Sequence, residues 1–182
     1  MISSKTISCQ VKVVFIAVVS ADGRIAESKE QLTLSWTSKD DTKFFIRKTK
    51  QLGVVIMGRK TFETIGKPLN DRLTIVMTKS PELYNHKQKE GLIEFTSMPP
   101  SAIIENLSLR GYGAAAVVGG SLVYSQFLRD RLVDEIYLTI EPVLFGRGIL
   151  LGDEFEKTSL RLLNLSRLGR DSVLVHYGVA RK

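Results

Sequence analysis

Cysteine and long apolar segments are both scarce in this sequence of 182 residues. Cys9 is the single cysteine, which excludes intrachain disulfides and argues against a cysteine metal site. The longest apolar run, Val13–Val19, is far shorter than a membrane-spanning helix requires. Residues 1–10 lack the charged start, the apolar core and the cleavage site of a signal peptide. Together these absences predict a cytoplasmic protein that does not contact a membrane.

Blocks of like charge are also missing, although the chain has a formal net charge of +7. A nucleic-acid-binding module would need clustered lysine and arginine with exposed aromatic side chains, whereas here the basic residues are scattered. The positive charge implies attraction to anions. Phosphorylated or polycarboxylate small molecules account for it as well as nucleic acid does, so we expect a small-molecule ligand.

The length suits a single domain, and no repeat, low-complexity segment or linker divides the chain. We expect one domain over residues 11–182, preceded by a short extension over residues 1–10. Apolar runs rich in β-branched residues alternate with helical stretches, which predicts an α/β fold. The expected strands are 11–20, 54–57, 73–77, 92–95, 114–118, 133–144 and 172–180, and the expected helices are 38–52, 60–65, 101–109 and 122–129. The polar stretches 27–35 and 79–89 are interpreted as loops.

The stretch 54–78 holds two buried strands joined by a short helix, a spacing that suggests a crossover between parallel strands. Directly after the first strand come Gly58, Arg59, Lys60 and Thr61. Free backbone N–H groups and cationic side chains at a helix N-terminus can bind an anion. A solvated first helical turn is the alternative that these residues leave open.

Ser38 is a good N-cap for the helix over 38–52, and Asp41 follows three residues later. Asp41 can reach back to the Ser38 backbone in a capping box, or it can face a ligand as a free carboxylate. Gly119 and Gly120 lie between a strand and a helix, where glycine lets the backbone approach a pyrophosphate. Taken alone, paired glycines are a weak signal.

Several of these stretches resemble dihydrofolate reductase and follow one another along the chain in the order found in that family. They are GRKTFETIGKPL with the basic residue that follows it, the spacing of Trp36, Asp41 and Phe45, and GGSLVYSQFL. The resemblance extends from about Val13 to Leu144. It implies a single-domain mixed sheet, mostly parallel with an antiparallel C-terminal edge strand, and helices on both faces. It also implies a cis peptide between Gly119 and Gly120.

The resemblance further implies an NADPH-dependent reductase that passes a hydride to C6 of dihydrofolate while N5 gains a proton. Its catalytic residues would be Asp41, Trp36 and Thr139. The substrate would contact Phe45, Ile65, Arg72 and Val118, with Arg72 leaning over the cleft mouth to pair with a carboxylate. The cofactor would contact Ala17, Ile25, Gly58, Arg59, Lys60, Thr61, Thr78, Lys79, Gly119, Gly120, Ser121, Leu122, Val123 and Tyr124.

Other features resemble the riboflavin-pathway pyrimidine reductases, which share the fold and NADPH but reduce the ribose of a phosphorylated aminopyrimidine. SADGRIA near the start and VDEIYLTIEPVLFGRG near the end carry this second resemblance. Ser35 stands where the dihydrofolate reductases usually have proline, and the loop over 25–36 is longer than in bacterial members. We favour folate because Asp41 and the middle of the chain fit it best. The alternatives are the pyrimidine and another small-molecule substrate, and the chain is expected to be a monomer or a homodimer.

Overall fold

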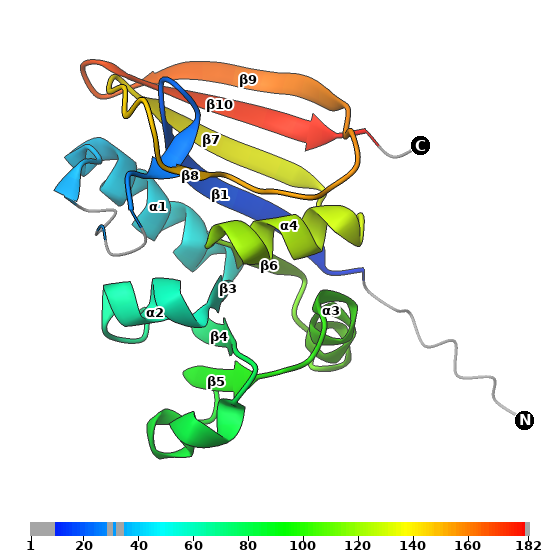
Figure 1. Cartoon of the computed structure of the whole chain (residues 1–182). Coiled ribbons are helices and arrows are strands. Elements are labelled where there is room, and N and C mark those ends of the chain that lie inside the picture. The colour runs from blue at the N-terminus through cyan, green and yellow to red at the C-terminus, as the bar shows by residue number, and fades with distance from the viewer. Residues whose placement is uncertain (1–9, 29–30, 32–34, 181–182) are drawn as a thin grey trace, which may run out of the picture.

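Eight strands form one twisted sheet in the order β5-β4-β3-β6-β1-β7-β10-β9 (Figure 1). The computed structural model describes residues 10–28, 31 and 35–180. The strands of this sheet are β1 Lys12–Ser20, β3 Val54–Gly58, β4 Leu73–Met77, β5 Ile93–Thr96, β6 Ala114–Val117, β7 Glu135–Glu141, β9 Leu160–Leu168 and β10 Ser172–Val179. Two short strands, β2 Arg24–Ala26 and β8 Ile149–Leu150, pair separately beside it.

The strands from β5 to β7 run parallel, and β1 lies near the middle of the sheet. β1 pairs with β6 on one side and with β7 on the other, so that Val14 lies opposite both Ala116 and Glu135. Its residues are nearly all apolar and buried, as a strand covered on both faces requires. The expected α/β class and the parallel crossover from β3 to β4 are confirmed.

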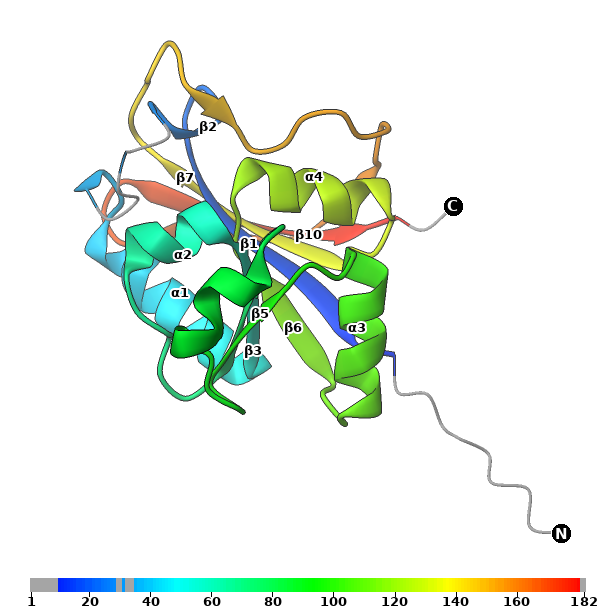
Figure 2. The same cartoon turned by 60° about the horizontal axis from the view of Figure 1, so that its bottom comes forward.

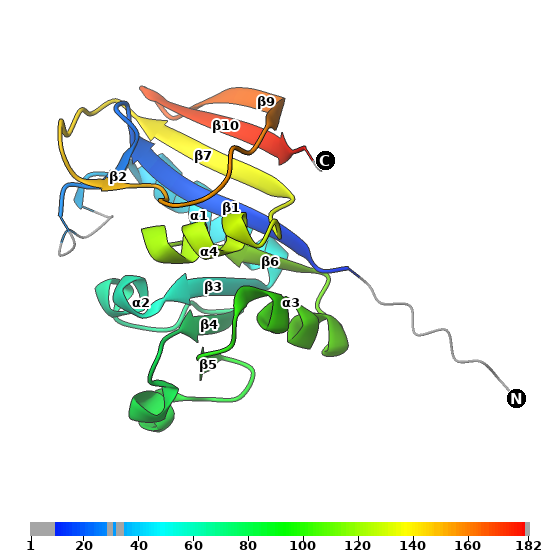
Figure 3. The same ribbon diagram turned by 45° about the vertical axis from the view of Figure 1, so that its right-hand side comes forward.

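Four α-helices cover the two faces of the sheet (Figures 2 and 3). They are α1 Lys39–Leu52, α2 Arg59–Ile65, α3 Pro100–Leu109 and α4 Ser121–Arg129. Phe44 of α1 and Phe62 of α2 belong to one buried cluster, whereas Leu107 of α3 and Phe127 of α4 belong to another. The parallel part of the sheet is therefore buried on both faces. Helix α1 ends where Gly53 adopts the left-handed conformation with φ 76°.

The C-terminal strands depart from the expected arrangement in one respect. β10 pairs antiparallel to β7, as expected, but it is not the edge strand, because β9 pairs along its other side. β9 was not predicted. Its sequence does not alternate regularly between apolar and polar residues, so it lacks the period that identifies a half-buried strand.

Three smaller expectations also need correction. The strand expected over 133–144 ends at Glu141, because Pro142 cannot continue a ladder of hydrogen bonds. The stretch 79–89 is not an open loop, since Pro81–Lys87 forms the 3₁₀-helix η2. The loop expected over 27–35 falls largely outside the described residues. In the part of the chain that the structure describes, no helix has the length and apolar character needed to cross a bilayer.

Candidate active site

The carboxyl ends of the parallel strands meet at one edge of the sheet, where ligands bind in open α/β folds. The backbone N–H of Gly58, at the end of β3, donates to the carbonyl oxygen of Gly119 at 2.8 Å. On the neighbouring strands Val18 of β1 lies opposite Thr139 of β7. Residues expected to hold cofactor and residues expected to hold substrate therefore converge on this edge.

Asp41 is the buried carboxylic acid of this region. It lies in the first turn of α1, only 8% of its surface is exposed, and its carboxyl is hydrogen-bonded to the Thr139 side chain. Burial raises the pKa of Asp41 from 3.8 to about 6, although the Thr139 hydrogen bond acts in the opposite direction. The nearby charge of Glu141 raises this pKa further. A carboxyl group with such a pKa can exchange a proton near neutral pH.

A second buried carboxylate, Glu141, fixes the start of the helix that carries Asp41. The Ser38 hydroxyl accepts a hydrogen bond from the Asp41 backbone N–H at 3.1 Å, so Ser38 is the N-cap. The backbone N–H of Ser38 donates to Glu141 Oε1 at 2.8 Å, and the Ser172 hydroxyl donates to Glu141 Oε2 at 2.5 Å. Glu141 therefore makes the contact that a capping box would assign to Asp41, whose carboxyl is left to face Thr139.

Sequence reasoning missed Glu141. The available signal was a charged residue in a mostly apolar strand, directly before Pro142. Glu141 is only 3% exposed. Buried carboxylates are rare unless they are hydrogen-bonded, and such a position therefore indicates a structural or functional partner. The partners lie on α1 and β10, far from Glu141 in sequence.

The apolar residues expected at the substrate gather on the same face of the sheet. Phe45 of α1, Ile65 of α2 and Val118 after β6 are all partly buried against the cluster that contains Phe44 and Phe62. They form an apolar wall on this face of the sheet, and Asp41 lies one helical turn before Phe45 in α1. A flat apolar ring would fit against such a wall.

Trp36 precedes α1 and packs edge-to-face against Phe145, with ring centroids 5.0 Å apart. In the part of the chain that the structure describes, its buried indole nitrogen Nε1 has no hydrogen-bond partner, and neither has the Thr37 hydroxyl. Buried polar groups are nearly always hydrogen-bonded. These two unpaired groups near the start of α1 are therefore available to a bound molecule or water.

The sequence predicted that Arg72 leans over the cleft mouth, and this prediction is wrong. Arg72 packs against α1 and is only 7% exposed. Its Nε donates to the Asn70 carbonyl oxygen at 2.9 Å, while its Nη1 donates to the Thr49 hydroxyl and to the Ile46 carbonyl oxygen. Burial lowers the pKa of the guanidinium. The side chain is thus held in place by the helix that also carries Asp41 and Phe45.

Glycines at the ends of β3 and β6 bring two backbone segments unusually close. A Cβ atom on Gly58 would lie 3.1 Å from Val123 Cγ2, and one on Gly120 would lie 3.3 Å from the Thr61 hydroxyl. Gly119 has φ 113°, which side-chain-bearing residues rarely adopt, and the expected cis peptide joins Gly119 to Gly120. The absence of side chains leaves backbone groups accessible for a phosphorylated ligand at the starts of α2 and α4.

The other residues expected at the cofactor differ in exposure. Tyr124 is buried behind Gly119 and donates its hydroxyl hydrogen to the Ile16 carbonyl oxygen at 2.8 Å, so it supports the glycine turn from inside. Lys60, Lys79 and Leu122 are exposed. The remaining positions are buried or partly buried, namely Ala17, Ile25, Thr61, Thr78, Ser121 and Val123.

Arg59 is already paired within α2. Its Nη1 lies 2.8 and 2.7 Å from the two carboxylate oxygens of Glu63, which also accepts a hydrogen bond from the Tyr84 hydroxyl at 2.9 Å. These contacts raise the pKa of Arg59 and lower that of Glu63. An anion that binds Arg59 therefore has to share it with Glu63 or displace Glu63.

The two stretches that resemble pyrimidine reductases contact each other. Asp22, in the turn after β1, accepts hydrogen bonds from the backbone N–H groups of Phe145 at 3.1 Å and Gly146 at 2.8 Å. The Ser20 hydroxyl donates to the same carboxylate at 2.6 Å, and these bonds lower the pKa of Asp22 to about 2. The turn after β1 is thereby tied to the loop after β7, beside Trp36 and Phe145.

Comparison with known proteins assigns this arrangement to a family. The dihydrofolate reductase family model matches residues 12–143. Dihydrofolate reductase type A13 of Escherichia coli is 38% identical over 158 residues, which cover 82% of this chain and 85% of that protein. A putative riboflavin biosynthesis protein from Shewanella has TM-score 0.75 at 21% identity, covering 94% of this chain and 100% of that one. Dihydrofolate reductase from Enterococcus faecalis, complexed with NADP(H), has TM-score 0.68 at 23% identity, covering 94% and 98%.

Replacing Asp41 by asparagine should stabilise the protein at pH 7. Between pH 3.8 and about 6 the folded state binds more protons at Asp41 than the unfolded state does, so the free energy of unfolding falls as pH rises through this window. The difference between the two pKa values corresponds to a change of at most roughly 3 kcal/mol in the free energy of unfolding. Thermal melts of the wild type and of Asp41→Asn should therefore differ most at pH 7 and converge near pH 4. Earlier melting of the variant at pH 7 would instead show that the Asp41 carboxylate stabilises the helix start.

Replacing Glu141 by glutamine should lower the pKa of Asp41, because the variant removes a neighbouring negative charge. Glutamine keeps an oxygen that can accept from the Ser38 N–H, so the melting temperature should change little. Glu141→Leu should cost about 1–3 kcal/mol, because it leaves the partly buried Ser38 N–H and the buried Ser172 hydroxyl without their partner. Carboxyl ¹³C NMR titration, with Asp41→Asn to assign the signal, measures the pKa directly. An Asp41 pKa that is the same in Glu141→Gln and the wild type would contradict this account.

Proposed function

This chain belongs to the dihydrofolate reductase family, and we propose that it reduces dihydrofolate to tetrahydrofolate by hydride transfer from NADPH. Membership makes it an NADP-dependent oxidoreductase with the fold of that family. The folate substrate and the assignment of individual residues are our proposal. Asp41 is the single observation that supports it best.

Asp41 combines three properties that suit a pterin. It is a buried acid with a pKa of about 6, it is held by Thr139, and it lies one helical turn from the apolar side chain of Phe45. A carboxylate can accept two parallel hydrogen bonds from the donor edge of a pyrimidine ring. The ring itself would lie against Phe45, Ile65 and Val118. Arg72, which is hydrogen-bonded to α1, would pair with a carboxylate at the other end of the substrate.

The glycine cradle fits the proposed cofactor. Gly58, Gly119 and Gly120 keep side chains out of the space between the starts of α2 and α4, and a Cβ at Gly58 or Gly120 would crowd its neighbours. Thr61, Ser121 and Thr78 would donate to phosphate oxygens, and Arg59, Lys60 and Lys79 would supply positive charge. When bound, NADPH supplies the hydride, and the chain supplies alignment and electrostatics.

The proposed role of Asp41 in the reaction is to orient the pterin and to keep a proton available near its ring. The Thr139 side chain fixes the position of the carboxyl, and burial keeps that carboxyl partly protonated near neutral pH. The packed rings of Trp36 and Phe145 would limit access of water on one side. The unpaired Trp36 Nε1 would donate to the substrate or to a single ordered water.

A riboflavin-pathway pyrimidine is the second candidate substrate. It is favoured by the contact between Asp22 and the loop at Phe145 and Gly146, because both partners belong to the stretches that resemble pyrimidine reductases. The Shewanella protein, named for riboflavin biosynthesis, superimposes with the higher TM-score, 0.75 against 0.68. At this identity the likeness speaks for the fold alone, so we rank folate first on the strength of Asp41.

The deciding assay follows NADPH consumption by absorbance with dihydrofolate and, separately, with the phosphorylated ribosylaminopyrimidine. We expect turnover with dihydrofolate and a fall in kcat/KM of about 10²-fold in Asp41→Asn at pH 7, the scale of a lost acid–base group. Asp40→Asn is the matched control, because Asp40 lies beside Asp41 in α1 but pairs with exposed Lys43. Turnover only with the pyrimidine would replace folate by the second candidate.

Arg59 should select NADPH over NADH. Arg59→Ala should raise the KM for NADPH about tenfold or more and leave that for NADH nearly unchanged, because only NADPH carries the additional phosphate. Glu63→Gln should act in the opposite direction, since it removes the carboxylate that now holds Arg59. Equal losses with both cofactors in Arg59→Ala would mean that the arginine only stabilises α2.

A further inference from the structure

The outer strand β9 exposes a row of leucines at the edge of the sheet. Leu160, Leu162, Leu163 and Leu165 are 44%, 55%, 41% and 59% exposed. β9 pairs only with β10 in the sheet of described residues, so the backbone groups along its other side form no ladder there. An edge of this kind is a template for another strand.

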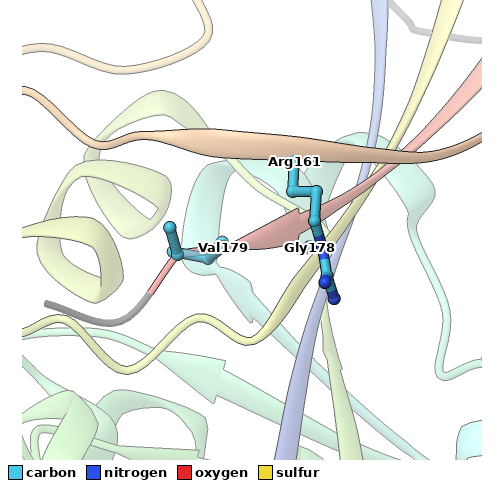
Figure 4. Close-up of a pocket in the computed structure, with 4 residues that line it drawn as sticks. Arg161, Gly178 and Val179 are labelled. Carbon is cyan, nitrogen blue, oxygen red and sulfur yellow. The ribbon is translucent and has the colours of Figure 1, made fainter.

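The two edges of the sheet differ in their protection. The opposite edge strand, β5, has four residues, Tyr84 of η2 stacks on its Phe95, and Lys89, just after η2, bridges to its Ile93. β9 has nine residues and contains neither proline nor lysine, two residues that commonly block an edge. The side chain of one of its arginines, Arg161, runs back across Gly178 of β10 (Figure 4), beside a pocket that these residues line with Val179 and Ala180.

A bulge in β9 determines which of its side chains share a face. Asn164 lies opposite His176 and Leu162 lies opposite Tyr177, so Leu163 has no partner on β10. Paired residues share a face, and Tyr177 and Val179 pack against the cluster of α3 and α4. On that face β9 therefore presents Leu160, Leu162, Leu165 and Arg167. Leu163 lies beside Gly178, on the other face, with Arg161, Asn164 and Ser166.

This pattern is self-complementary in one antiparallel register. If Leu162 lies opposite Leu165 of a second copy, then Leu160 lies opposite Arg167, Arg161 opposite Ser166, and Leu163 opposite Asn164. Every pair then shares a face, and the two-fold axis passes between Leu163 and Asn164. A shift by one or two residues puts at least one pair on opposite faces, which a continuous sheet does not allow. No arginine lies opposite another arginine in this register.

We propose that β9 joins two copies of this chain edge to edge, in this register, into one continuous antiparallel sheet. The pairing satisfies the open backbone groups of both edges and gathers Leu162 and Leu165 of both copies on the face of α3 and α4. It requires the same surface on each subunit, which is the geometry of a two-fold dimer. The proposal does not depend on the substrate.

The first test measures the mass of the full chain by analytical ultracentrifugation at micromolar concentration. We expect a dimer for the wild type and a monomer for the double variant Leu162→Lys, Leu165→Lys, with unchanged circular dichroism. Leu83→Lys with Leu109→Lys is the matched control, since both residues are exposed but lie on η2 and α3. A monomeric wild type, or a dimer that both lysines leave intact, would overturn the proposal.

The second test checks the register with cysteines in a chain whose Cys9 is replaced by serine. Leu162→Cys with Leu165→Cys should give a covalent dimer on mild oxidation, because the two positions face each other across the axis at a distance that a disulfide can span. Either cysteine alone should give little crosslink, because the same position in the two subunits is then offset by about three residues along the paired strands. Single variants that crosslink as well as the double variant would refute this register.

Discussion

The burial of the Asp41 carboxyl is the constraint on which the site depends. A carboxylate that is removed from water has to be held in place, and here Thr139 binds the carboxyl while Glu141 binds the backbone at the start of the same helix. Burial is the main cause of the raised Asp41 pKa, and the nearby charge of Glu141 raises it further. The fold tolerates this because Glu141 receives hydrogen bonds from Ser38 and Ser172 on two other elements. Burial of the ionised Asp41 carboxyl should lower the free energy of unfolding at neutral pH, and the same burial gives Asp41 a pKa at which it can exchange a proton.

Much of this arrangement could be predicted from the sequence, for identifiable reasons. The parallel strands are short, mostly apolar runs rich in β-branched residues between polar or glycine-containing stretches, so Val54–Gly58 and Leu73–Met77 were predicted to within one residue. Ser38 is an N-cap by type and position. The placement of Asp41 toward the site, by contrast, rested on resemblance, since the helix alone allowed a capping box. The structure explains the choice, because Glu141 takes the hydrogen bond that Asp41 would otherwise have accepted.

The features that could not be predicted depend on contacts distant in sequence. Glu141 acts through Ser38, 103 residues earlier, and no local pattern encodes that pairing. Arg72 is anchored by hydrogen bonds to Thr49 and Ile46 of α1. Its position in the sequence alone could not show whether its side chain is anchored in this way or open at the cleft. β9 escaped detection because the bulge at Leu163 interrupts its alternation, and the same bulge leaves leucines exposed on both faces.

β10 connects the site to the exposed edge. Leu174 of β10 lies opposite Thr139 on one side and opposite Ser166 of β9 on the other, and Ser172 at its start donates to Glu141. Edge strands fray more readily than central ones, because fewer contacts hold them. In a monomer β10 is separated from solvent by one strand only. Two copies paired through β9 would separate β10 from its counterpart by the two β9 strands, deep within a continuous sheet. The hydrogen bond that fixes Glu141, and through it the start of α1, would then lie in the interior of the assembly instead of near its margin.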